Sequence, residues 1–280
     1  MLADVLDVLR CPVCTGSFRH EGAALRCGAG HTFDVARQGY VNLLGSAGPR
    51  TADTGPMVQA RADFLAGRHY APLAGAVTAA VADLIPDDPS PVVLDVGGGT
   101  GYYLTAAIDA RPGAIGIALD LSKFAIRRAA RAHPRIAAAV WDVWQPLPIA
   151  DAAVSVILDV FAPRNAAEFG RVLDPAGAVL VVTPTDRHLA ELIDRIGMLT
   201  VDTHKEERLG RRLGGHLELI GRDELTWSLT LSGADIERLV RMGPSARHVS
   251  DATLTERIAA LEGSVTVTAS VLISRYGRAE

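Results

Sequence analysis

All three cysteines of the chain lie within its first 27 residues, and a histidine follows the last of them. Cys11 and Cys14 form CPVC, and Cys27 and His31 form CGAGH, which gives the pattern C-x2-C-x12-C-x3-H. Zinc is bound by four such ligands, and two ligands on one tight turn preset half of a tetrahedron. The pattern predicts a closed, structural zinc site whose metal supplies folding energy to a small N-terminal module.

Two other interpretations of these residues explain less of the pattern. A Cys-x-x-Cys redox pair would use CPVC alone, leaves Cys27 and His31 without a role, and is not followed by a helical pattern here. Three unrelated buried thiols and a surface histidine would not gather in one tenth of the chain. Metal binding is therefore the interpretation we adopt.

A second group of residues with chemical potential is the glycine-rich stretch PVVLDVGGGTGYYL at positions 91–104. A nicotinamide fingerprint would need a glycine where Tyr102 stands, and a phosphate-binding P-loop would need Gly-Lys-Ser/Thr, which is absent. Asp95 also argues against a phosphate-containing ligand, because an acid in this loop repels a pyrophosphate but suits an ammonium group. We expect the loop, with Gly97, Gly99 and Gly101, to hold S-adenosylmethionine.

Acidic residues also end the next two predicted strands. Asp120 is placed to take both ribose hydroxyls of a nucleoside, and Asp142 is placed to take the adenine amine. Ligands of parallel sheets bind beyond the carboxyl ends of the strands, where these acids would gather with Asp95. For each acid taken alone, a helix N-cap or a solvated loop remains the alternative.

The elements that must position these residues alternate between strand and helix. A helical pattern begins near Pro56, and apolar strands are predicted at 92–96, 114–120, 137–141, 153–159 and 177–184. Helices are expected between them, at about 101–110, 122–132, 165–173 and 186–196. The stretch 264–276 alternates apolar and polar residues, as an antiparallel or edge strand does. The order predicts an α/β fold of the class I methyltransferase arrangement, with helices on both faces of a parallel sheet.

Composition limits the remaining possibilities. With 280 residues, 49% hydrophobic and 21% charged, the chain suits one large domain, or one large domain and a small module. The net charge of −4 disfavours general nucleic-acid binding and leaves only a local basic patch. No run reaches 18 apolar residues and the N-terminus lacks a basic start, so we expect neither a membrane span nor a signal peptide, and a cytoplasmic location.

Taken together, these segments resemble a known family. The zinc pattern followed by HTFDVARQGYVNLL, DTGPMVQARADFLAGRHYAPL, LDVGGGTGYY, LDLSKFAIRRAARAHP and RVLDPAGAVLVVTPTDRHLAEL is similar to the bacterial 23S rRNA guanine-N1 methyltransferases, called RlmA-like. Their Gram-positive branch includes the tylosin-resistance enzymes of macrolide producers, and the MGPSARH stretch favours that branch. The resemblance spans essentially the whole chain and is strongest from 11 to 190.

The resemblance implies a domain organisation and a reaction. It implies a zinc-binding module over 1–45, a linker and helix over 46–70, and a class I methyltransferase domain with a Rossmann-like seven-stranded sheet over 71–280. It further implies methyl transfer from S-adenosylmethionine to N1 of a guanine in a 23S rRNA hairpin loop near the peptide exit tunnel. Macrolide resistance and a homodimer are expected on the same ground.

The family's functional positions can be carried over by residue. Cys11, Cys14, Cys27 and His31 match its zinc ligands. Residues that contact the cofactor in the family match Tyr70, Gly99, Thr100 and His188. Together with the residues argued above, the expected cofactor set is Tyr70, Asp95, Gly97, Gly99, Thr100, Gly101, Asp120, Asp142 and His188. The chain departs from the family where Gly98-Gly99-Thr100 replaces the frequent Cys-Gly-Glu, and at Thr54-Gly55-Pro56.

The sequence does not identify the group that accepts the guanine N1 proton. Asp159 and His188 lie at the expected edge of the sheet, but neither is assigned as the base. The stretch DVFAPRN lacks the Asn/Asp-Pro-Pro-aromatic signature of exocyclic-amine methyltransferases, which is consistent with a ring-nitrogen target. RNA contacts are expected from the zinc module and from 204–216, although a solvated loop is an equal alternative for the latter.

Two other classes of function are left open. A small-molecule methyltransferase acting on a natural product would be active without RNA and would carry hydrophobic loops around 200–220. A non-enzymatic zinc-ribbon RNA-binding protein would have lost its cofactor site. The intact cofactor residues argue against that second class, namely Asp95, Gly97, Gly99, Gly101 and Asp120.

Overall fold

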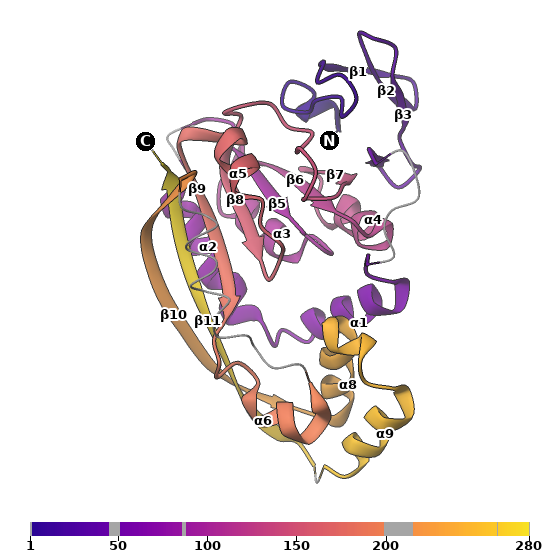
Figure 1. Ribbon diagram of the computed structural model, residues 1–280, viewed down its shortest axis with the longest axis vertical. Coiled ribbons are helices and arrows are strands. Elements are labelled where there is room, and N and C mark those ends of the chain that lie inside the picture. Colours follow the sequence, from indigo (N-terminus) through magenta and orange to yellow (C-terminus); the bar gives the residue numbers. More distant parts are fainter. Residues whose placement is uncertain (1, 45–50, 86–87, 199–214, 262, 280) are drawn as a thin grey trace.

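The computed structural model describes residues 2–44, 51–85, 88–198, 215–261 and 263–279, and it is built around one mixed sheet of eight strands (Figure 1). In spatial order the strands are β10 (Leu217–Leu231), β11 (Val265–Arg278), β9 (Leu173–Pro184), β8 (Val154–Val160), β5 (Val92–Val96), β6 (Ile115–Asp120), β7 (Ile136–Val140) and β4 (Tyr40–Asn42). The strands from β9 to β4 are parallel to one another, whereas β11 is antiparallel to both β9 and β10.

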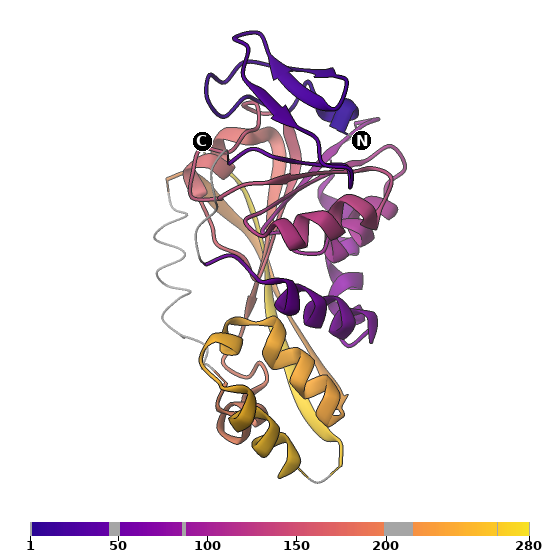
Figure 2. The same ribbon diagram turned by 90° about the vertical axis from the view of Figure 1, so that its right-hand side faces the viewer.

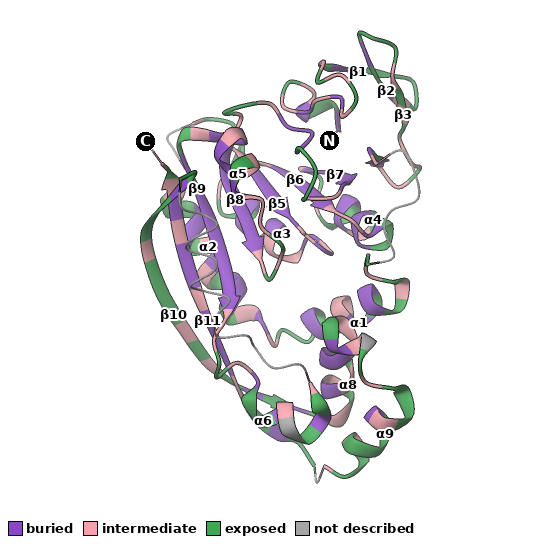
Figure 3. Ribbon diagram, in the orientation of Figure 1, coloured by how far each residue is buried: buried purple, intermediate pink, exposed green. Residues whose placement is uncertain are grey.

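The predicted α/β fold class is confirmed, with one strand more than expected. Seven of the strands follow the class I methyltransferase arrangement, and β4 adds an eighth beside β7, where Val41 pairs with Ala139. The antiparallel assignment of 264–276 is also confirmed. This strand is not at the edge of the sheet, however, because β10 lies outside it and presents mostly exposed side chains (Figure 3).

Helices cover one face of the sheet. They are α2 (Ala71–Leu84), α3 (Tyr102–Asp109) and α4 (Lys123–Ala132), while α1 (Gly55–Ala66) packs against α4 and against the later helix α8 (Gly233–Met242). Neighbouring residues of one strand serve the two layers in turn, since Ala118 packs into the core on this face while Ile117 and Leu119 pack into the opposite core. Burial on both sides explains why these strands are apolar along their whole length.

The opposite face is covered differently. Residues 141–153, all of which the structure describes, connect β7 to β8 without a helix. The face is instead packed by α5 (Ala166–Val172), by the 3₁₀ helix η1 (Leu2–Val5) and by buried residues of the N-terminal module such as Leu9 and Leu25. An isolated bridge between Leu9 and Ile149 fixes this packing. The N-terminal module therefore completes the core of the main sheet.

The module itself has a small antiparallel sheet of three strands. They are β1 (Phe18–Glu21), β2 (Ala24–Cys27) and β3 (Thr32–Asp34). The stretch after His31 forms two strands, β3 inside the module and β4 in the main sheet. The division at residues 45 and 70 stays a prediction, and β4 shows that the part before residue 45 is joined to the large sheet.

A small helical lobe lies beyond the carboxyl ends of β8 and β9, at the opposite end of the elongated molecule from the zinc module (Figure 2). It contains α6 (Ala190–Leu192), the π-helical turn η2 (Ile193–Gly197), α8 (Gly233–Met242), the 3₁₀ helix η3 (Pro244–Arg247) and α9 (Asp251–Ala259). The helix expected at 186–196 was wrong in extent, because regular α-helix covers only three residues there. Within the described residues, every helix is too short or too polar to cross a membrane.

Candidate functional site

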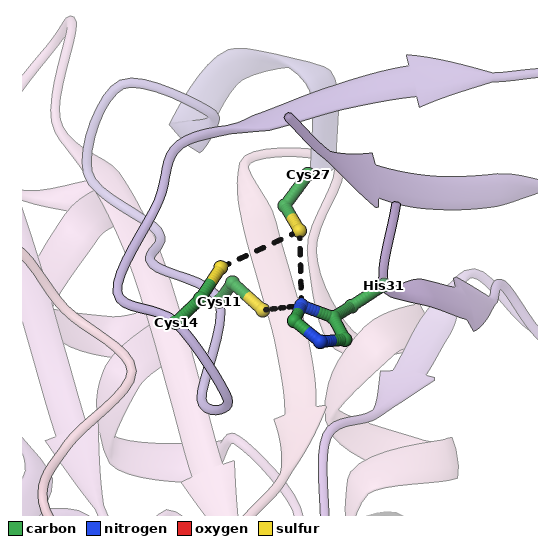
Figure 4. Close-up of side chains that lie close together, drawn as sticks. All are labelled: Cys11, Cys14, Cys27 and His31. Atoms are coloured by element: carbon green, nitrogen blue, oxygen red, sulfur yellow. Dashed lines mark hydrogen bonds between the residues drawn. The ribbon is translucent and has the colours of Figure 1, made fainter. Parts of the chain in front are cut away.

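The four predicted metal ligands converge in the N-terminal module (Figure 4). Their donor atoms all lie within 4.8 Å of one another. The sulfurs of Cys14 and Cys27 are 3.6 Å apart, and Nδ1 of His31 lies 3.6 Å from the sulfur of Cys11 and 3.3 Å from that of Cys27. Zinc–sulfur and zinc–nitrogen bond lengths imply tetrahedral edges of about 3.8 Å between two sulfurs and about 3.6 Å between sulfur and nitrogen. The cluster therefore has the dimensions of a zinc site.

The electrostatics of the cluster also suit a cation. Desolvation raises the pKa of the Cys27 thiol, but hydrogen bonds with Cys14, His31 and backbone amides outweigh it and lower this pKa to about 6. A thiolate is the form that ligates zinc. Cys11 and Cys27 are buried, and the four protein ligands leave no open position for a substrate. The arrangement is that of a structural metal site.

The glycine loop follows β5 directly, at the carboxyl edge of the sheet. Gly97, Gly99 and Gly101 all have positive φ, at 69°, 55° and 79°. A side chain at Gly97 would also place its Cβ 2.7 Å from the Cβ of Ala162, in the loop after β8. The backbone N–H of Gly97 donates to the carbonyl of Leu119 at 2.8 Å, which ties the loop to β6. Glycine is therefore required for both conformation and space.

Asp95, the last acid before this loop, is buried without a full set of partners. Its side chain is 2% exposed, and its Oδ2 atom has no hydrogen-bond partner among the described residues. Burial, followed by the nearby charges of Asp120 and Asp159, raises the pKa of its carboxyl to about 8. A buried carboxyl with an open oxygen is matched by a cationic group, which would restore the charged form.

The other two predicted acids shape the backbone around the loop. Asp120, at the end of β6, accepts hydrogen bonds from the N–H of Gly99 at 2.9 Å and of Ser122 at 2.7 Å. Asp142 accepts from the N–H of Trp144 at 3.1 Å and so caps its own turn. Asp142 therefore has a local turn-capping contact, whereas Asp120 is buried and contacts the glycine loop directly.

Tyr70 and His188 come together although the sequence separates them. The hydroxyl of Tyr70, at the start of α2, lies 3.1 Å from Nε2 of His188, in the loop after β9. The N–H of Ser270 in β11 donates to Nδ1 of the same ring at 3.1 Å. Burial lowers the pKa of His188 to about 4, so the ring is neutral at pH 7 and carries its proton on Nε2, which donates to Tyr70.

The remaining predicted cofactor residue, Thr100, faces a different space. It lines a cavity of about 780 Å³ between α1, α2, α3 and α4, whose lining includes Tyr102 and Arg128 but none of the three acids. The structure thus brings Asp95, Asp120 and the glycines together on one edge. Thr100 borders the far side of their loop.

Sequence reasoning missed three residues of this region. Arg61 of α1 pairs with Asp53 at 2.6 Å and donates to the carbonyl of Met242 at 2.8 Å, which joins α1 to the helical lobe. Its charge also lowers the pKa of Asp120, although burial of that acid is the larger effect and raises it. Arg164 pairs with the fully buried Asp159 at 3.1 Å. These contacts depend on tertiary packing between segments that are distant in the sequence.

A third missed residue is Phe161, which follows β8. Its ring is 6.3 Å from that of Tyr70 and 5.9 Å from that of His188, measured between centroids. Tyr70 also packs against Phe64 and Trp227 in edge contacts. The site therefore has an acidic side at β5 and β6 and an aromatic side at β8 and α2.

Known proteins match both parts of the chain. A zinc-ribbon family model with the description "RlmA, N-terminal" matches residues 9–47, which include all four metal ligands. The 23S rRNA (guanine(748)-N(1))-methyltransferase of Streptomyces fradiae is 48% identical over 97% of this chain and 97% of its own length. A Micromonospora griseorubida protein, for which a 23S rRNA (guanine-N(1)-)-methyltransferase activity is proposed, is 50% identical over 99% of both chains.

Solved structures resemble the chain in fold. A chain from the complex of the Haloferax volcanii Trm112 methyltransferase activator with a methyltransferase has a TM-score of 0.50 at 20% identity, covering 81% of this chain and 99% of its own length. The YcgJ protein of Bacillus subtilis has the same TM-score at 14% identity, covering 74% and 99%. The fold is thus shared with distant proteins, whereas the sequence is shared with close ones over nearly their full length. By that close likeness the chain belongs to the family of 23S rRNA (guanine-N1)-methyltransferases.

Proposed function

We propose that this chain transfers a methyl group from S-adenosylmethionine to N1 of a guanine in a hairpin loop of 23S rRNA. The observation that carries the proposal is the 48% identity with the Streptomyces fradiae enzyme over 97% of both chains. The name of that relative makes guanine 748 the first position to inspect.

The cofactor assignment is supported by the fit of the site. The open, buried oxygen of Asp95 suits the ammonium group of the methionine portion, and the glycine loop allows close backbone approach. Asp120 and Asp142 each keep acceptor capacity for the ribose hydroxyls and the adenine amine. We propose as further contacts Tyr70, Gly97, Gly99, Thr100, Gly101 and His188. Bound there, the cofactor supplies an electrophilic methyl group.

Methyl transfer in line with the sulfonium depends on how the reacting groups are positioned. The ring cluster, which consists of Tyr70 and the rings packed around it (Phe64, Phe161, His188 and Trp227), can hold them in place. Tyr70 is 3% exposed, so its hydroxyl stays un-ionised, because burial raises its pKa further. His188 holds its proton on Nε2 and so presents no free lone pair to the guanine proton. Asp159 is fully buried and paired with Arg164. We therefore assign neither His188 nor Asp159 as the base.

Several wider expectations remain proposals. RNA contacts are proposed for the zinc module; the basic stretch 204–216 lies outside the described residues up to position 214. The division into a zinc module, a linker and a methyltransferase domain is kept as proposed. So are a homodimer, a cytoplasmic location and a role in macrolide resistance.

Primer extension tests the proposal directly. A methyl group on N1 blocks the Watson–Crick edge, so reverse transcriptase should stop one base before it. Purified protein, S-adenosylmethionine and a 23S rRNA transcript or ribosomal particle should give one stop in a hairpin loop, absent without cofactor. No stop on any substrate, with cofactor binding intact, would exclude the rRNA activity and favour the small-molecule alternative.

A further inference from the structure

Phe161 combines two features that a packed phenylalanine does not have. Its side chain is 41% exposed, although the surrounding aromatic side chains are largely buried. Its φ is 56°, in the left-handed region that a bulky residue adopts only under strain. A glycine would take this conformation freely, so the ring is retained at an energetic cost. Strain of this kind is characteristic of functional positions.

The contacts of Phe161 fix where the ring lies. Its N–H donates to the carbonyl of Val182 in β9 at 3.1 Å. The ring meets Tyr70 and His188 at interplanar angles of 50° and 38°, so these two side chains support one part of it. The next residue, Ala162, is packed so closely against Gly97 that no side chain fits between them. The backbone that carries Phe161 therefore lies beside the glycine loop.

The position of Phe161 within the sheet separates it from the nucleoside side of the site. The strand order is β8-β5-β6-β7, and Asp120 and Asp142 follow β6 and β7. Phe161 follows β8, on the other side of β5. The proposed ribose and adenine contacts thus follow strands on one side of β5, and Phe161 follows the strand on its other side, which those contacts leave free.

We propose that Phe161 is the surface against which the target guanine stacks once it has turned out of its RNA loop. This rests on the proposed function and adds a residue that positions the acceptor. An exposed aromatic face suits a base because every base offers a π-face of its own. A guanine whose N1 is to be methylated must leave its pairing partner, and stacking compensates for the contacts that it loses.

Three variants of the full chain test the proposal. Phe161→Leu removes the aromatic face and keeps much of the apolar volume, whereas Phe161→Tyr restores a ring. The matched control is Phe124→Leu, because Phe124 is 43% exposed but lies outside the ring cluster. With 23S rRNA transcript as substrate, Phe161→Leu should lower kcat/KM roughly 10- to 100-fold, mainly through KM for RNA. S-adenosylmethionine affinity should fall much less than kcat/KM for RNA, because Phe161 reaches the proposed cofactor contacts only through Tyr70 and His188 and lies away from the proposed nucleoside contacts. Phe161→Tyr should recover most of the activity.

The outcomes are distinguishable. If the wild type methylates no RNA, the proposed function fails. If the wild type is active and Phe161→Leu equals Phe124→Leu, the stacking role fails. A loss in cofactor affinity alone would place Phe161 with the cofactor and also overturn it. Should Phe161→Leu not fold, wild-type protein can be cross-linked to RNA that carries 6-thioguanosine at the methylated position. The cross-link should map to the peptide containing Phe161, and a cross-link elsewhere would contradict the proposal.

Discussion

Tyr70 and His188 stand 118 positions apart in the chain, yet the phenol oxygen and Nε2 of the imidazole are 3.1 Å apart. The N–H of Ser270 occupies the other ring nitrogen of His188. The histidine is thereby held as one neutral tautomer, with Nε2 as the donor and Tyr70 as the acceptor. His188, which the sequence places at the functional edge of the sheet, is thus a fixed hydrogen-bond donor within a buried network.

The protonation of His188 can be measured directly. Because burial lowers its pKa to about 4, the ring should stay neutral as pH falls from 8 to 5, whereas an exposed histidine charges near 6.5. In nitrogen-15 spectra of histidine-labelled protein, one ring should keep the Nε2–H pattern throughout, and His188→Gln should remove that signal. A signal assigned to His188 that titrates near pH 6.5 would contradict the proposed tautomer.

Cofactor binding should release a proton from Asp95. The pKa of this carboxyl is raised to about 8 in the free protein, so it is mostly protonated at pH 7. A cation beside it favours the charged form, and the proton leaves on binding. Titration calorimetry of S-adenosylmethionine at pH 7, in buffers of different ionisation enthalpy, should report release of nearly one proton. Asp95→Asn should bind more weakly and lose this release, and equal release from both proteins would count against the assignment.

The same group gives a stability prediction for the free protein. Between about pH 4 and pH 8 the folded state keeps a proton on Asp95 that the unfolded state has lost. The contribution of Asp95 to the free energy of unfolding is therefore fully present below pH 4 and is lost as pH rises through 8. As pH rises across this window, the free energy of unfolding of Asp95→Asn should increase relative to that of the wild type, as measured by urea denaturation. A constant difference at all pH values would refute the raised pKa.

Two glycine-to-alanine changes should have opposite effects. Gly97→Ala places a Cβ 2.7 Å from that of Ala162 at a φ of 69°, so we expect about 1–3 kcal/mol of destabilisation and a loss of cofactor binding. Gly75 lies in α2, and apart from its two chain neighbours and the adjoining backbone of its own helix no atom lies within 4 Å of the place that a Cβ would take there. Gly75→Ala should stabilise the protein by about 0.5–1 kcal/mol. Urea denaturation measures the change in the free energy of unfolding for each variant. If the two changes were equal, the loop would tolerate a side chain.

Metal removal should weaken the large domain as well as the module. Leu9 and Leu25 share a core with Ile117 and Leu119 of the main sheet, so loss of the zinc site exposes apolar surface on both. A loss of about 3 kcal/mol would lower Tm by roughly 6–12 °C. Calorimetry with and without a zinc chelator, at one bound metal per chain, should show this shift. Val13→Ala, at an exposed position between the first two ligands, should keep both metal and Tm. If chelated and untreated protein melted at the same temperature, the zinc module would not contribute to the stability of the main sheet.

The sequence was informative wherever a local pattern dictates structure. The strand predicted at 92–96 matches β5, and that at 114–120 differs from β6 by one residue, because burial on both faces leaves uninterrupted apolar runs. The zinc ligands were also predictable, since each pair lies on one short turn and the four side chains need only a compact module to meet.

What could not be predicted depends on packing between distant segments. Nothing in the sequence of Tyr40–Asn42 says that these three residues pair with β7 rather than with the module. The left-handed backbone of Phe161 is imposed by its neighbours, against the preference of the residue itself. The partner of His188 depends on where β11 is inserted, which the alternation of 264–276 indicates only as antiparallel.

The place of β11 between β9 and β10 has a consequence for biosynthesis. This strand is made after all the others of the sheet, yet it separates β9 from β10 and supplies Ser270 to His188. A nascent chain that ends before Ser270 therefore exposes an unpaired edge of β9 and lacks the donor that sets the tautomer of His188. The site can be completed only after translation of β11, so a partly synthesised chain should be an inactive client for chaperones.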